Sequence, residues 1–139
     1  AHHPTEVLAT LKIARLIVQN KISQLPRVAK RVVVIFQPHR YSRTKQFLNE
    51  FAHSLQDADQ VIFAPIYAAG ERPIPGITND SLPECLKLIS PKTKISRHNS
   101  LDDITNLMEE KTKESDIVLL IGAGNINTIW EKLHTNNNG

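Results

Sequence analysis

The sequence is poor in several residue types, and each scarcity argues against a class of protein. Cys85 is the one cysteine, so the chain forms no internal disulfide, and no Cys and His residues have zinc-ligand spacing. Only 5% of the residues are aromatic, and the 17 Lys and Arg residues are scattered rather than grouped in a stripe. No apolar run approaches the ~20 residues that cross a bilayer. We therefore expect a reducing compartment, with neither nucleic acid nor a membrane as partner.

Length and composition set the number of domains. A chain of 139 residues with 40% hydrophobic content can bury one real core, but not several. The net charge of +3 is mild and typical of an ordinary surface. We expect one domain over residues 1–134, and a disordered tail over residues 135–139, where small polar residues dominate.

An apolar segment runs directly into a polar cluster. Residues 32–36, Val-Val-Val-Ile-Phe, are apolar at every position, which is typical of a parallel strand covered on both faces. His39, Arg40 and Arg43 follow it. Ligands of open α/β sheets bind at the carboxyl ends of the strands, and a guanidinium group binds carboxylates or phosphates through forked hydrogen bonds. The pattern favours an anionic ligand, although solvated surface arginines have the same spacing.

Predicted strands and helices alternate along the chain. Helices are expected over residues 4–20, from a Thr44 cap to Leu55, from an Asp80 or Ser81 cap to Leu88, from a Ser100 cap onward, and around Ile126, Ile129, Trp130 and Leu133. Further strands are expected over residues 60–66, 92–96 and 116–121. This order predicts the α/β class: a Rossmann-like, doubly wound, mostly parallel sheet flanked by helices on both faces.

In such a sheet the polar residues that follow the strands meet at one edge. They are Arg40 and Arg43 after the first strand, Tyr67 and Glu71 after the second, and Asn125 after the fourth. The Gly122-x-Gly124 pair lacks the third glycine of a dinucleotide-binding loop, because Asn127 stands there. A tight turn is therefore the better interpretation of that pair.

Four blocks of the sequence resemble the carboxyl-terminal domain of the Mur ligases. They are His2-His3-Pro4-Thr5-Glu6, the strand and loop of residues 33–44, Tyr67-Ala68-Ala69-Gly70-Glu71, and Gly122-Ala123-Gly124-Asn125. The His-x-Pro element is general to the family, whereas the arginine loop and the Tyr-Ala-Ala-Gly-Glu loop are similar to those of the L-alanine-adding members. The resemblance covers nearly the whole chain.

The resemblance implies an amide-forming reaction in peptidoglycan precursor synthesis. Such enzymes transfer the γ-phosphoryl group of ATP, with Mg2+, to a substrate carboxylate, and an amine then attacks the acyl phosphate. In the L-alanine-adding members the carboxylate belongs to UDP-N-acetylmuramic acid, and L-alanine supplies the amine. We therefore expect these three substrates in a bacterial cytoplasm.

The resemblance also implies roles for single residues. Arg40 and Arg43 would hold the carboxylate of L-alanine, and His39 would shape the same pocket. His2 would lie near the reacting groups or ATP. For His3 we expect instead, from its place next to Pro4, a structural role at the entry to the first helix. The remaining implied contacts are Ala123 and Gly124 with the amino acid, and Tyr67 with the nucleotide.

The sequence has no Gly-x-x-x-x-Gly-Lys-Ser/Thr loop for phosphates and no carboxylate cluster for Mg2+. In the family those parts belong to the central domain, and the first domain holds the uridine nucleotide. We therefore expect an excised domain that is inactive without the N-terminal and central domains. Two alternatives stay open: a stand-alone module that binds an anionic small molecule or phosphosugar, and a small isomerase that uses Glu71 and His39 as an acid–base pair.

Overall fold

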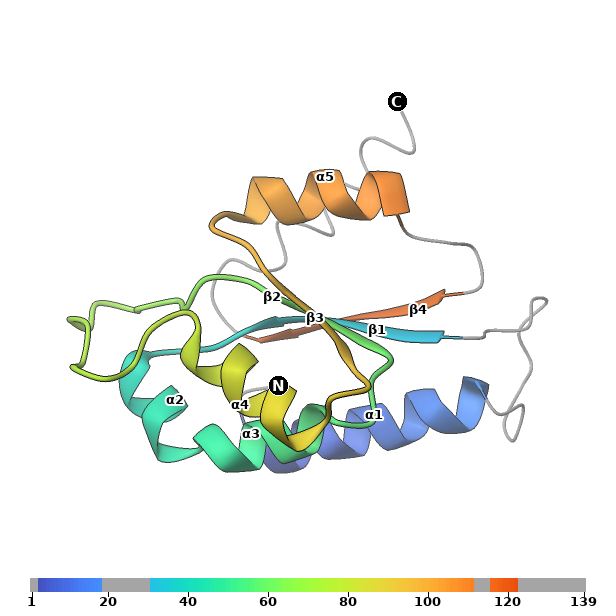
Figure 1. Cartoon of the computed structure of the whole chain (residues 1–139), viewed down its shortest axis with the longest axis horizontal. Coiled ribbons are helices and arrows are strands. Elements are labelled where there is room, and N and C mark those ends of the chain that lie inside the picture. The colour runs from blue at the N-terminus through green and yellow to red at the C-terminus, as the bar shows by residue number, and fades with distance from the viewer. Residues whose placement is uncertain (1–2, 19–30, 112–115, 123–139) are drawn as a thin grey trace.

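The computed structural model describes residues 3–18, 31–111 and 116–122 (Figure 1). In these residues four strands form one parallel sheet in the order β3-β2-β1-β4: β1 (Arg31–Gln37), β2 (Gln60–Phe63), β3 (Lys94–Arg97) and β4 (Asp116–Gly122). The helices of the same residues are α1 (Pro4–Val18), α2 (Tyr41–Gln46), α3 (Leu48–Leu55), α4 (Ser81–Ile89) and α5 (Leu101–Lys111). The predicted parallel α/β fold is confirmed.

Helices cover both faces of the sheet, as expected. Figure 1 shows α1, α3 and α4 on one face and α5 on the other, and α3 packs against both α1 and α4. The chain steps outward from β1 to β2 and β3 with its helices on the first face, and then returns past β1 to β4 with α5 on the second face. Crossovers of one hand require this change of face when the direction along the sheet reverses.

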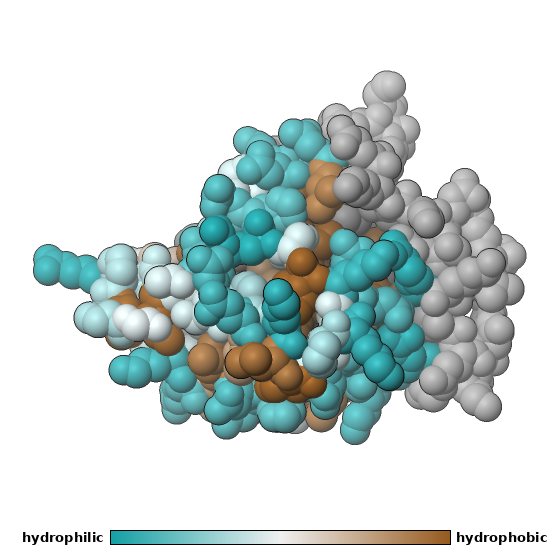
Figure 2. All heavy atoms as spheres, in the orientation of Figure 1, coloured by the Kyte–Doolittle hydropathy of each residue, from teal (hydrophilic) through white to brown (hydrophobic). Residues whose placement is uncertain are grey.

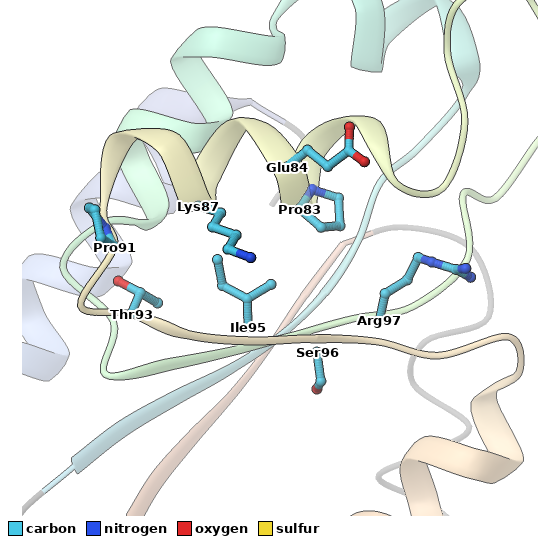
Figure 3. A pocket seen from close by; sticks show the side chains of 8 residues that line it. All are labelled: Pro83, Glu84, Lys87, Pro91, Thr93, Ile95, Ser96 and Arg97. Carbon is cyan, nitrogen blue, oxygen red and sulfur yellow. The ribbon is translucent and has the colours of Figure 1, made fainter.

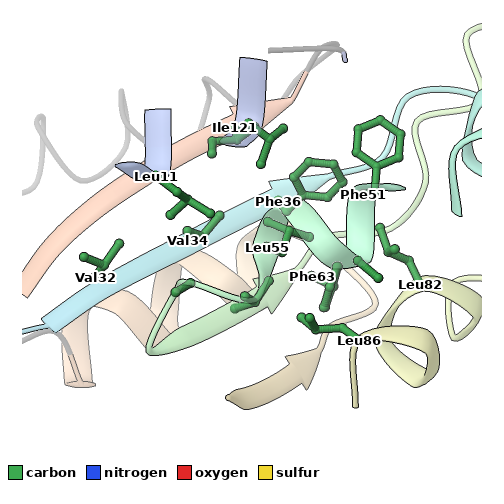
Figure 4. Packing of buried hydrophobic residues seen from close by; sticks show 14 of the residues in the cluster. Leu11, Val32, Val34, Phe36, Phe51, Leu55, Phe63, Leu82, Leu86 and Ile121 are labelled. Atoms are coloured by element: carbon green, nitrogen blue, oxygen red, sulfur yellow. The ribbon is translucent and has the colours of Figure 1, made fainter. Parts of the chain in front are cut away.

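The side chains of β1 alternate between two hydrophobic clusters. Residues 32, 34 and 36 join the larger cluster with α1, α3 and α4, and residues 33 and 35 join the smaller one with α5. Phe36 lies at the centre of the larger cluster, with its ring centroid 5.4 Å from that of Phe51 and 6.2 Å from that of Phe63 (Figure 4). Burial on both faces explains why this segment contains no polar alternation.

The predicted helix cap at Thr44 is wrong. The helix begins earlier, at Tyr41, with Arg40 as its N-cap residue, and Thr44 is buried inside α2. Its Oγ1 donates a hydrogen bond of 2.8 Å to the Arg40 carbonyl, four residues back. A threonine hydroxyl can either cap a helix or bond to the carbonyl four residues back, and at this buried position inside α2 it does the second. The helix also breaks at Phe47, which separates α2 from α3.

Two strands have different bounds from those expected. β2 ends at Phe63 rather than at residue 66, because Pro65 has no N–H to continue a ladder and the Asn79 side chain binds the N–H of Ile66 at 2.9 Å. β3 spans Lys94–Arg97 instead of residues 92–96.

The predicted helix cap at Ser100 is confirmed, since its Oγ accepts a hydrogen bond of 3.1 Å from the Asp103 N–H. The helix predicted around Trp130 and the boundary at residue 134 lie outside the described residues.

Candidate functional site

The carboxyl ends of β1, β2 and β4 lie at one edge of the sheet, because the three strands are parallel. The strand order reverses between β1 and β4, and this switch point is where α/β sheets usually bind ligands. Figure 1 shows α2, which follows β1, and the long loop that follows β2 at the same end of the molecule. The polar loops after β1 and β2 therefore meet, as the sequence predicts.

Backbone hydrogen bonds join these two loops beyond the ends of the strands. The Tyr67 N–H donates to the Pro38 carbonyl at 2.9 Å, and the Arg40 N–H donates to the Tyr67 carbonyl at 2.7 Å. His39 and Tyr67 thus form a parallel bridge, and their rings stack with centroids 5.8 Å apart. Tyr67 remains 37% exposed, so the stacked pair borders solvent.

The two arginines lie at the start of α2, Arg40 as its N-cap residue and Arg43 as its third residue. Arg40 has a φ of 69°, a left-handed conformation that is uncommon outside glycine. Its N–H is bound by Tyr67, and its carbonyl accepts hydrogen bonds from the N–H and Oγ1 of Thr44 at 3.2 and 2.8 Å. The Arg40 side chain is exposed, and that of Arg43 is half-buried. The fold thus fixes the backbone from which both guanidinium groups extend.

Glu71 binds the start of α2, a contact that sequence reasoning missed. The Ser42 N–H donates to Glu71 Oε1 at 3.1 Å, and the Ser42 hydroxyl donates to Oε2. These two bonds, then a weaker one from the Tyr41 amide and the charge of Arg40, hold the pKa of Glu71 below its ordinary value. A carboxylate with a lowered pKa is a weak base, which argues against the isomerase alternative. Ser42 and Glu71 are 29 residues apart, and no local pattern links them.

His3 directly precedes α1 and binds its first turn, in keeping with the structural role expected for it. Its Nδ1 accepts a hydrogen bond of 3.1 Å from the Thr5 N–H, and its carbonyl accepts one of 3.0 Å from the Glu6 N–H. The His3 ring meets the ring of Phe47 edge-on at 5.1 Å, and the Phe47 N–H donates to the Arg43 carbonyl at 3.0 Å. The start of α1 therefore lies against the end of α2, one helical turn beyond Arg43.

Gly122 ends β4 beside Gln37 of β1. It has a φ of 146°, and a Cβ at this position would lie 2.6 Å from the Gln37 carbonyl oxygen. Only glycine permits so close an approach of two backbones. The predicted roles of His2, Ala123, Gly124 and Asn125 lie outside the described residues and stay predictions.

A pocket of about 300 Å³ lies elsewhere, between α4 and the edge strand β3 (Figure 3). Figure 3 shows Lys87 reaching over Ile95, with Ser96 turned to the other side of the strand. None of the predicted site residues lines it; the lining residues are Pro83, Glu84, Lys87, Pro91, Thr93, Ile95, Ser96 and Arg97. Figure 2 shows a hydrophobic strip on this face amid hydrophilic surface, and a strip of this kind is ordinary for a folded domain.

Neither a metal-binding cluster nor a membrane-spanning helix is present in the part of the chain that the structure describes. No group of three or more His, Cys, Asp or Glu side chains among these residues could hold a metal ion. No helix within residues 3–18, 31–111 and 116–122 is long and apolar enough to cross a bilayer.

The fold and this edge define a Rossmann-like α/β domain whose polar loops gather at the switch point of its sheet. The family model described as Mur ligase, glutamate ligase domain, matches residues 1–124. The chain belongs to the Mur ligase family.

Among its curated relatives are enzymes named UDP-N-acetylmuramate--L-alanine ligase. The chain is 45% identical over 133 residues to that of Synechococcus sp. (strain CC9311), and 48% identical over 133 residues to that of Prochlorococcus marinus (strain MIT 9303). Each match covers 96% of this chain, but only 28% of the Synechococcus relative and 27% of the Prochlorococcus relative. The chain thus spans under a third of the length of the curated relatives it matches.

Solved structures share the fold. The chain is similar to a UDP-N-acetylmuramate-alanine ligase from Thermotoga maritima, with a TM-score of 0.71 and 23% identity, over 99% of this chain and 25% of that one. It is also similar to a murein peptide ligase from Psychrobacter arcticus, with a TM-score of 0.67 and 20% identity, over 97% of this chain and 25% of that one. At these identities the likeness concerns the fold alone.

Proposed function

We propose that this chain is the amino-acid-binding, carboxyl-terminal domain of an ATP-dependent ligase that joins L-alanine to UDP-N-acetylmuramic acid. The observation that carries the proposal is the pair of arginines at the start of α2, at the edge where the loops of β1 and β2 meet. Relatives that are 41–50% identical over 96% of the chain carry the name of such a ligase.

In this proposal Arg40 and Arg43 bind the carboxylate of L-alanine. A guanidinium group donates two parallel N–H hydrogen bonds to the two oxygens of a carboxylate, and such charge-assisted hydrogen bonds are strong and directional. Holding the carboxylate orients the amine for attack on the acyl phosphate; the new amide bond forms as inorganic phosphate leaves. The contribution of this domain is orientation, which converts an encounter of two substrates into a local step.

The other predicted residues complete the same site. His39, whose ring stacks on that of Tyr67, shapes the pocket for the amino acid in this proposal, and Tyr67 contacts the nucleotide. His2, Ala123 and Gly124 add contacts from the two flanking segments. ATP and Mg2+ bind the central domain of the longer polypeptide, and UDP-N-acetylmuramic acid binds its first domain. The proposed compartment is the bacterial cytoplasm, whose reducing conditions suit the free thiol of Cys85.

A chimaeric enzyme tests the proposal. This chain is joined to the first two domains of the Synechococcus relative, and phosphate release is measured with UDP-N-acetylmuramic acid, ATP and Mg2+, with and without L-alanine. We expect release that depends on L-alanine from the chimaera and none from the chain alone. Glycine and L-serine in place of L-alanine report the preference of the pocket. A chimaera that folds, by its circular dichroism, but shows no L-alanine-dependent release would refute the proposal.

A further inference from the structure

The loop that follows β2 holds the start of α2 at two points. Tyr67 binds the backbone N–H of Arg40 at 2.7 Å, and Glu71 binds Ser42 through its N–H and its hydroxyl. Between these points the loop turns back on itself, because Ala69 and Gly70 have φ values of 50° and 87°. The Glu71 N–H then bonds to the Ala68 carbonyl at 3.0 Å. The two contacts hold the backbone at Arg40 and Ser42, and Arg43 follows Ser42 directly.

We propose that Glu71 is a positioning residue of the amino-acid site: its carboxylate fixes the first turn of α2 and so sets where the guanidinium groups of Arg40 and Arg43 lie. The proposal rests on the function proposed above. Both oxygens of Glu71 accept hydrogen bonds from Ser42, so its carboxylate acts on the start of α2.

The local structure explains why α2 needs an outside acceptor. The helix has only six residues, and a helix of one to two turns does not form by itself. Its first N–H groups have no acceptor within the helix, and its N-cap residue, Arg40, makes no side-chain cap hydrogen bond. Glu71 supplies that acceptor at the second helical residue. Its negative charge also lies at the positive end of the helix.

A simple counter-ion to Arg40 would be a different role for Glu71. Arg40 does lower the pKa of Glu71, but the hydrogen bonds of Ser42 lower it more. The two roles predict opposite changes on neutralising Glu71. A counter-ion competes with the substrate carboxylate, so its loss would tighten L-alanine binding, whereas loss of the positioning contact would weaken it.

The test compares Glu71→Gln with the matched control Glu50→Gln, an exposed carboxylate in the first turn of α3. Amide hydrogen exchange at Ser42 is followed by NMR in the 139-residue chain. We expect exchange to become roughly tenfold faster in Glu71→Gln, because the single, uncharged amide oxygen of glutamine replaces two carboxylate oxygens and accepts more weakly, and to be unchanged in the control. Unchanged exchange at Ser42 in Glu71→Gln overturns the contact, whatever the enzyme does.

The same variants are then measured in the chimaeric ligase. We expect the KM for L-alanine to rise roughly tenfold in Glu71→Gln while the KM for ATP stays constant. A purely structural loss would give a different result: it would reduce the amount of active enzyme and so lower the apparent kcat. An unchanged or lowered KM for L-alanine overturns the positioning role. A wild-type chimaera without L-alanine-dependent turnover refutes the proposed function, and with it any role of Glu71 in that site.

A milder variant guards against misfolding. Ser42→Ala removes the hydroxyl that donates to Glu71 Oε2 and keeps the N–H that donates to Oε1. We expect it to change the KM for L-alanine in the same direction as Glu71→Gln but by less. A KM equal to that of wild type in a folded Ser42→Ala variant, together with an unfolded Glu71→Gln variant, assigns Glu71 to stability and overturns the proposal.

Discussion

The substitution Gly122→Ala tests whether the close approach of β4 to β1 is set by the missing side chain. An alanine Cβ would lie 2.6 Å from the Gln37 carbonyl oxygen and 3.1 Å from the Gln37 Cβ. Gln37 is buried at the end of the central strand, so its backbone cannot yield without moving the core. The φ of 146° adds backbone strain for any residue with a Cβ.

The expected cost follows from these two causes. Backbone strain of this kind costs roughly 1–3 kcal/mol, and overpacking of a buried site costs a similar amount. We expect Gly122→Ala to lower the free energy of unfolding by about 4 kcal/mol, a large share of the roughly 5–15 kcal/mol of a typical domain. For a domain of this size that corresponds to a fall in Tm of about 15 °C.

Gly76→Ala is the matched control. Gly76 has a φ of 87°, also unfavourable for alanine, but an alanine Cβ at this position would have nothing within 4 Å. Strain alone then predicts a loss of about 1 kcal/mol. Urea unfolding followed by circular dichroism measures both variants in the 139-residue chain. If Gly122→Ala costs no more than Gly76→Ala, the contact with Gln37 is not the reason for glycine at the end of β4.

Three further predictions concern the arginines, Glu71 and the core. In the chimaeric ligase, Arg43→Ala should raise the KM for L-alanine roughly 30-fold, the loss of one charge-assisted contact, whereas the exposed Lys45→Ala on the same helix should change it less than about twofold; similar effects of the two would contradict the assigned role. Ser42 and, to a lesser degree, Arg40 lower the pKa of Glu71 from 4.5. The Glu71 carboxylate therefore stabilises the fold fully above pH 4.5, and this stabilisation is lost as the pH falls through the lowered pKa. In urea unfolding, the stabilities of wild type and Glu71→Gln should differ most above pH 4.5 and converge in acid. Phe36→Ala should lower the free energy of unfolding by about 3–5 kcal/mol, and Ile13→Ala, at a side chain that is 57% exposed, by less than about 1 kcal/mol, both by urea unfolding.

Local patterns predicted most of the fold. The unbroken apolar run of residues 32–36 identified a strand buried on both faces, and the structure places it at the centre of the sheet. Val7, Leu11 and Ala14, spaced for one face of a helix, are all buried. The errors fell where two local outcomes have similar energies. Thr44 could cap a helix or bond to the carbonyl four residues back, and nothing short of the packed core distinguishes them.

The sequence by itself determined the class of fold and the edge at which the polar loops meet, and it named Arg40 and Arg43 as candidates there, because the periodicity of apolar residues and the parallel direction of the strands are sufficient for those predictions. Only the tertiary structure decided how the arginines are held. The hydrogen bonds between Tyr67 and Arg40 and between Glu71 and Ser42 join residues 27 to 29 positions apart on neighbouring loops. Glycine is needed at the end of β4 because a side chain there would collide with a carbonyl oxygen of the neighbouring strand β1. Contacts of this kind depend on which loops the folded sheet brings together, and the sequence of one loop does not indicate which residue of the other loop it will contact.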